Sequence, residues 1–167
     1  MKVYLYSAFV ACALALAACS PKVEAPAAER SASDPIVPSN PFFGKWQLTR
    51  AQVAPWWDEK GETPVADPAL TMVEFEPAKS AGAPIVTCDK PKYAVALATP
   101  PGLFQGNLAE PFSQARMLGF MEKEITILNF SCDSGGVDVS LDFPMLDENT
   151  IMLGLDNVIY TLSRTPE

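Results

Sequence analysis

The chain has 167 residues, 49% of them hydrophobic, a formal net charge of −8 at pH 7 and no histidine. Without a cluster of Lys and Arg, that balance argues against binding nucleic acid and against electrostatic attachment to anionic lipid. The lack of histidine excludes a Ser-His-acid or Cys-His catalytic site and a histidine-based metal centre, so we expect a non-catalytic protein without cofactor or metal.

The N-terminus has the order of an export signal. Lys2 precedes an uninterrupted apolar run from Ala8 to Ala18, which is too short to span a bilayer. The run closes on Leu16-Ala17-Ala18-Cys19, which resembles the lipobox of bacterial lipoproteins. The alternative is an ordinary signal peptide that is cleaved nearby.

The lipobox resemblance implies a location in the cell. Residues 1–18 would be the signal peptide, and Cys19 would carry the lipid, including palmitate. The protein would then be lipid-anchored in the cell envelope and would contact the membrane through its N-terminal lipid. Ser20 is not the aspartate that commonly retains such proteins at the inner membrane, so the outer membrane, facing the periplasm, is expected.

Residues 19–40 follow as the lipidated N-terminus and a tether. The segment consists mainly of Ser, Pro, Ala and Glu, a composition that cannot bury enough apolar surface to fold. We expect a disordered linker that spans about 25 Å as a flexible coil. Residues 41–167 then form a single domain.

Alternation of apolar and polar residues dominates that domain. Val137 to Phe143 alternates without interruption, which is typical of a half-buried antiparallel strand. Residues 123–132 are strand-like but apolar on both faces, so the pattern leaves their register open. Eight segments are predicted as strands: 43–50, 71–76, 85–88, 93–97, 123–132, 137–143, 150–155 and 157–164.

One helix and two hairpin turns complete the predicted elements. A short helix is expected over Asn107 to Leu118, with Asn107 as its N-cap, and turns at Asp133–Gly136 and Asp147–Asn149. A calcium site at residues 133–138 is the alternative to the first turn, but it lacks the necessary number of ligands. Closing eight sequential strands removes their unpaired edges. We therefore expect a mainly β fold, an antiparallel barrel of about eight strands with the helix between strands four and five, rather than a sandwich.

The two ends of the domain carry a family resemblance. Gly44-Lys45-Trp46 on the first strand, together with Arg164 near the end of the last, resembles the signature of lipocalins and their calycin relatives. In that group the tryptophan packs at the closed end of the barrel against an arginine from the final strand. The resemblance implies structural roles for Gly44, Trp46 and Arg164. The position of the predicted helix departs from lipocalins, whose long helix follows the barrel.

Two cysteines remain once the signal and Cys19 are set aside. In an oxidising compartment, Cys88 and Cys132 are expected to form a disulfide that closes a loop of about 45 residues. The competing interpretation, a metal site, lacks histidine and lacks a further cysteine at metal-site spacing.

Two long connections carry the candidate binding residues. Ala51–Ala69 contains Trp56 and Trp57, and Thr99–Glu122 contains Phe104. Loops of this length are often lids or binding loops, so these three aromatic residues could frame the mouth of an apolar cavity. The alternative is that one tryptophan plugs the barrel end while the other lies against the helix.

Two functional hypotheses follow. In the first, the barrel binds an apolar small molecule or an envelope component without transforming it. In the second, it is a protein-binding module, such as an inhibitor of an envelope-attacking enzyme or an envelope assembly accessory, because tethered small barrels also resemble bacterial lysozyme inhibitors. An interior void would favour the first; a packed barrel with an exposed Trp56 and Trp57 patch would favour the second.

Overall fold

The computed structural model describes residues 40–57, 63, 65–134 and 137–166. The signal, Cys19 and most of the predicted tether lie outside these residues. The described elements are β1 (Gly44–Val53), β2 (Met72–Phe75), β3 (Ser80–Gly82), the 3-10 helix η1 (Pro84–Val86), β4 (Lys92–Ala98), the 3-10 segment η2 (Pro100–Gly106), α1 (Pro111–Met117), β5 (Ile125–Ser134), β6 (Val137–Asp147), β7 (Thr150–Leu155) and β8 (Val158–Arg164).

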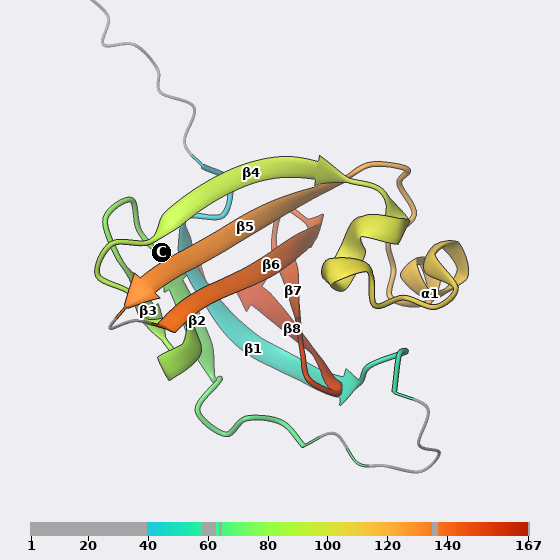
Figure 1. Cartoon of the computed structure of the whole chain (residues 1–167), viewed down its shortest axis with the longest axis horizontal. Coiled ribbons are helices and arrows are strands. Elements are labelled where there is room, and N and C mark those ends of the chain that lie inside the picture. The colour runs from blue at the N-terminus through green and yellow to red at the C-terminus, as the bar shows by residue number, and fades with distance from the viewer. Residues whose placement is uncertain (1–39, 58–62, 64, 135–136, 167) are drawn as a thin grey trace, which may run out of the picture. The chain divides into compact units, whose positions relative to one another are not determined.

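The described strands form one antiparallel sheet in the order β3-β2-β1-β8-β7-β6-β5-β4. The first strand thus pairs with the last, while every other neighbouring pair in the sheet is consecutive along the chain. The sheet is strongly curled, with β4, β5 and β6 crossing over β1 and β8 (Figure 1). The prediction of a mainly β fold with a short helix between β4 and β5 is confirmed.

The prediction of a closed barrel is wrong, because β3 and β4 are the two edges of an open sheet. β3 has only three residues, and in the described chain its backbone pairing toward the β4 side is an isolated bridge from Ser80 to Cys88. The predicted strand at residues 85–88 is also wrong. Pro84 begins a 3-10 turn there, and the strand that the pattern missed lies just before it, at Ser80–Gly82.

The sheet buries apolar side chains on both faces. The concave face holds the main core, which includes Trp46, Phe75, Phe130 and Tyr160. η2 and α1 supply a second cluster with Ile125 and Ile127 of β5 and Met152 and Ile159 of β7 and β8. Residues 123–132 are apolar on both faces because one face of β5 packs in the main core and the other packs in the second cluster.

The helix is shorter than expected at its start. α1 begins at Pro111 with Glu110 as its N-cap, so the prediction of Asn107 as the cap is wrong. Proline is favoured in the first turn because its missing N–H would have no partner there. Asn107 instead ends η2, where its side-chain amide donates a 2.8 Å hydrogen bond to the Phe104 carbonyl.

Candidate binding site

We call the gap between the edge strands β3 and β4 the seam. One end of the seam is joined by covalent and backbone bonds. Cys88 and Cys132 form the expected disulfide, with their Cα atoms 6.1 Å apart, so that prediction is confirmed. Ser80 and Cys88 exchange two backbone hydrogen bonds of 2.8 and 3.0 Å. The segment leading into β4 is therefore held to both edges of the sheet.

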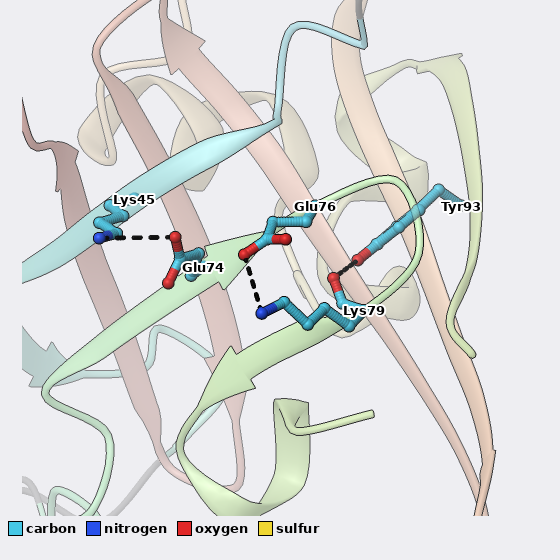
Figure 2. A network of polar contacts seen from close by, with 5 residues as sticks. All are labelled: Lys45, Glu74, Glu76, Lys79 and Tyr93. Carbon is cyan, nitrogen blue, oxygen red and sulfur yellow. Dashed lines mark hydrogen bonds and ion pairs between the residues drawn. The ribbon is translucent and has the colours of Figure 1, made fainter. Parts of the chain in front are cut away.

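Tyr93 extends this joined end into β4. Its hydroxyl donates a 3.0 Å hydrogen bond to the Lys79 carbonyl in the β2–β3 hairpin, as Figure 2 shows beside the Lys79–Glu76 and Lys45–Glu74 ion pairs. Its ring packs edge-on against Phe43 and Phe75, at centroid distances of 5.4 and 5.9 Å. Burial raises the pKa of the Tyr93 hydroxyl above its ordinary value of 10.0. Side-chain packing thus replaces strand pairing at this point.

Past Tyr93, no described segment pairs with β4 across the seam, and we call this part of the seam open. Val95 and Leu97 project from the same face of β4 as Tyr93, because alternate side chains in a strand share a face. Yet Val95 is 47% exposed and Leu97 is 64% exposed. Their partners on β5 are Leu128, which is fully buried, and Thr126. The side chains on this face of β4 therefore become more exposed from Tyr93 to Leu97. The reason is that the short β2–β3 hairpin ends at the level of Tyr93 and covers no residue beyond it.

A pocket of about 670 Å³ lies at the end of the sheet where β5 begins and β6 ends, and its lining includes Thr126, the β5 partner of Leu97. Its walls combine apolar groups with four carboxylates and one arginine. The apolar lining includes Pro41, Phe120, Met121, Ile125, Met145 and Leu146, and the charged lining consists of Glu122, Glu124, Asp147, Glu148 and Arg164. The described residues form two ion pairs, and neither includes a carboxylate of this pocket.

Although Arg164 lines the pocket, its guanidinium contacts Trp46 and backbone carbonyls. Its guanidinium carbon lies 4.0 Å from the ring centroid of Trp46, which is fully buried and stands opposite it in the β1–β8 register. The same group donates hydrogen bonds to the carbonyls of Phe43 (2.8 Å), Glu148 (3.1 Å) and Pro41. This is the contact that the lipocalin resemblance implies.

Gly44 has a physical reason to be glycine in this cluster. Its φ of +119° is rarely adopted by residues with a side chain, and a Cβ there would stand 3.2 Å from the Arg164 guanidinium. The Gly44, Trp46 and Arg164 positions therefore depend on one another. The arginine is held by carbonyl oxygens, which leaves the four pocket carboxylates without a cationic partner among the described residues.

Trp56 and Phe104, two of the three aromatic residues predicted to bind a ligand, lie in the second cluster, on the other face of the sheet from the main core. Trp56 donates a 2.8 Å hydrogen bond to the Asp156 carbonyl and packs 5.6 Å from Phe104, centroid to centroid. Both rings cover Gly154, where a Cβ would come within 3 Å of each. Phe104 is only 4% exposed, whereas Trp57 is 41% exposed. Trp56 and Phe104 are thus parts of the second cluster, and ligand binding by the three residues stays a prediction.

The backbone of η2 is strained where Phe104 enters this cluster. Phe104 and Gln105 have φ values of +50° and +59°, the left-handed region that residues with a Cβ seldom occupy. Each such residue costs about 1 kcal/mol or more. Burial of the Phe104 ring against Trp56 and Phe120 offsets that strain. The strain thus has a packing explanation.

Other chemistry finds little support in the described part of the chain. No group of three Cys, Asp or Glu side chains there could hold a metal ion. None of its helices has the length and apolarity to cross a bilayer. No protein family, curated protein or solved structure shows a significant match to the chain. The open seam and its pocket are therefore the features from which a function can be argued.

The residues of the open seam were not among the predicted site residues. Alternation assigns Val95 and Leu97 to the buried face of a strand, and that assignment of the face is right. The pattern does not show that these two side chains lack a neighbouring segment to cover them. One signal was available: residues 93–98, Tyr-Ala-Val-Ala-Leu-Ala, have neither charge nor proline, although edge strands usually carry one of them.

Proposed function

We propose that this chain is a lipid-anchored, non-catalytic binding module of the bacterial cell envelope, facing the periplasm, that captures a segment of a partner protein at the open part of the seam. The observation that carries the proposal is the exposure of Val95 and Leu97 beside the acidic pocket. A monomer has little reason to keep such side chains in water on the edge of a sheet.

The filled interior supports a protein partner over an enclosed small molecule. Phe75 packs against Phe143 and Phe130 at centroid distances of 5.1 and 6.2 Å, and all three rings are fully buried, as is Trp46. Every buried side-chain nitrogen or oxygen in the described residues has a hydrogen-bond partner. Aromatic rings thus fill the middle of the main core. Binding of an apolar small molecule stays a prediction.

Photocrosslinking in intact cells tests the proposal. A photoreactive phenylalanine analogue would replace Leu97, with Val65 as the matched control, because Val65 is also exposed (77%) and lies far along the chain from β4. We expect a discrete crosslinked protein from Leu97 and none from Val65. Equal crosslinking from both positions, or a crosslink from Leu97 to residues 20–39 of the same chain, would contradict capture of a partner.

The lipid anchor has its own test. Cys19→Ala should abolish incorporation of labelled palmitate and leave an unprocessed or released protein. Labelling equal to that of the parent chain would refute Cys19 as the lipidation site. The result is independent of the seam, because residues 44–166 carry all the described strands.

A further inference from the structure

We infer that the captured segment is an extended peptide that adds a strand to the free edge of β4 and carries lysine or arginine side chains into the acidic pocket. This inference rests on the proposed function and specifies the chemistry of the partner. It is carried by three features: the unpaired edge of β4, the exposed apolar side chains on it, and the unbalanced negative charge next to them.

The edge of β4 is built for strand addition. β4 has seven residues and pairs only with β5 in the described sheet. No backbone hydrogen bond from another described segment reaches residues 93–98. An incoming strand would lie about 4.8 Å away and pair with these groups, which gives affinity that depends little on the incoming sequence.

Flanking residues limit where a strand can add. Lys90, Pro91 and Lys92 precede the uncharged stretch, and Pro100 and Pro101 follow it. Proline and lysine are the residues that proteins place on edge strands to prevent pairing. The other edge, β3, is protected differently, because it is short and Ser80 is already bonded to Cys88. About six residues of β4 are thus left available for pairing.

The β4 side chains next to this edge determine which partner side chains would suit each face of the added strand. On the concave face, every second partner side chain would lie beside Val95 and Leu97. On the convex face the neighbours would be Ala94, Ala96 and Ala98, of which Ala96 and Ala98 already pack against the second cluster, so that face suits apolar partner side chains. The concave positions suit a long side chain whose apolar stem covers Leu97 and whose charged end reaches the pocket.

Charge decides which long side chain fits. The pocket has Glu122, Glu124, Asp147 and Glu148 in its walls, while the Arg164 guanidinium is bonded to backbone carbonyls. Lysine and arginine complement this surface, and glutamate would be repelled. A neighbouring pocket, lined in part by Lys45 and Glu74, is less selective because those two side chains already form an ion pair.

Two other occupants fit the charge less well. A second copy pairing edge to edge would bring together two chains that each have a net charge of −8. The chain's own residues 20–39 carry three acidic and two basic side chains, so they offer no net positive charge. A basic segment of a different protein is the occupant that the charges favour.

Binding of designed peptides to the full chain in detergent solution tests the inference. The probe is a labelled octapeptide of alternating valine and lysine, compared with one of alternating valine and glutamate and with a valine-lysine peptide N-methylated on alternate residues. We expect the lysine peptide to bind at least about tenfold more tightly than the glutamate peptide at 0.1 M salt, with the difference shrinking at 1 M salt as the charges are screened. The N-methylated peptide, which cannot complete a strand ladder, should not bind measurably.

Matched variants locate the binding. Glu122→Gln with Glu124→Gln should weaken the lysine peptide about tenfold, while Asp89→Asn with Asp138→Asn, the same charge change at exposed positions outside the pocket, should not. Leu97→Lys should weaken binding, and Val65→Lys should not. All four positions in the charge variants are exposed, so folding should be retained, and circular dichroism checks this.

The outcomes separate the inference from the proposed function. Equal affinity for the lysine and glutamate peptides, or equal loss in test and control variants, overturns the basic strand. If Leu97 still crosslinks a partner in cells under that result, the proposed function stands with a partner of other chemistry. A dimer in sedimentation that Leu97→Lys dissociates would also overturn the inference, because the edge would then serve a second copy.

Discussion

Arg164→Ala should destabilise the domain mainly through the loss of its contact with Trp46 and with three backbone carbonyls. The guanidinium lies 4.0 Å from the indole centroid and donates to the carbonyls of Phe43, Glu148 and Pro41. Those carbonyls belong to the segment before β1 and to the β6–β7 turn. One side chain therefore ties the entrance of the domain to its last three strands.

The magnitude follows from these contacts. A cation on an aromatic ring contributes about 0.5 to 2 kcal/mol. Each hydrogen bond to a carbonyl adds about 0.5 to 1 kcal/mol here, below the value for buried charged donors, because Arg164 is only half-buried. We expect Arg164→Ala to lower the free energy of unfolding by about 2 to 5 kcal/mol. Arg164→Lys should recover only part, since an ammonium lacks the planar fork that reaches several carbonyls.

A double-mutant cycle isolates the ring contact. Trp46→Leu removes the aromatic ring and with it the indole N–H, which donates a 2.8 Å hydrogen bond to the Phe42 carbonyl. Unfolding by urea, followed by far-ultraviolet circular dichroism, would be measured for both single variants and the double variant. We expect a coupling of about 0.5 to 1 kcal/mol. Effects that add to within about 0.3 kcal/mol would refute an interaction between guanidinium and ring.

Three further predictions follow from the seam and the second cluster. Replacing Cys88 and Cys132 with serine should lower the free energy of unfolding by about 4 kcal/mol, the chain-entropy value for their separation of 44 residues, and unchanged stability would contradict this. Gly154→Ala should cost about 1 to 3 kcal/mol, because the added Cβ would stand 2.8 Å from a Trp56 ring carbon and 2.9 Å from Phe104; an unaltered urea midpoint would show that the rings yield. The raised pKa of Tyr93 means that its stabilisation is complete below about pH 10 and is lost as pH rises through the higher folded-state value. Tyr93→Phe should therefore lose less stability than the parent chain as the pH rises above about 10, and parallel losses would argue against burial of the hydroxyl.

Sequence analysis correctly predicted the elements whose local residue pattern is enough to determine their structure. The uninterrupted alternation at residues 137–143 lies within β6, and the turn at Asp147–Asn149 joins β6 to β7. The Asp133–Gly136 turn falls partly outside the described residues. β3 was missed because Ser80-Ala81-Gly82 has no apolar alternation, and its strand conformation comes from pairing with β2. Residues 85–88 look like a strand by composition, but the backbone follows Pro84 instead.

The open seam was beyond the reach of periodicity for a different reason. A period of two shows which residues share a face and cannot show whether anything covers that face. Val95 and Leu128 face each other across β4 and β5, and one is half exposed while the other is fully buried. The difference lies in a third segment, the β2–β3 hairpin, whose short length is a tertiary property. The same limit explains the expectation of a closed barrel.

The pairing of β1 with β8 also sets the order in which the chain can mature. The hydroxyl of Thr49 bonds to the carbonyl of Thr161, 112 residues later, and Trp46 is covered by Arg164 from the same final strand. The first strand to be synthesised thus has to wait for the last before it can bury its tryptophan, and contacts of such long range form slowly. If residues 1–18 act as the predicted export signal, this delay would keep the domain unfolded until synthesis is complete, which is the condition in which a polypeptide can be threaded across a membrane.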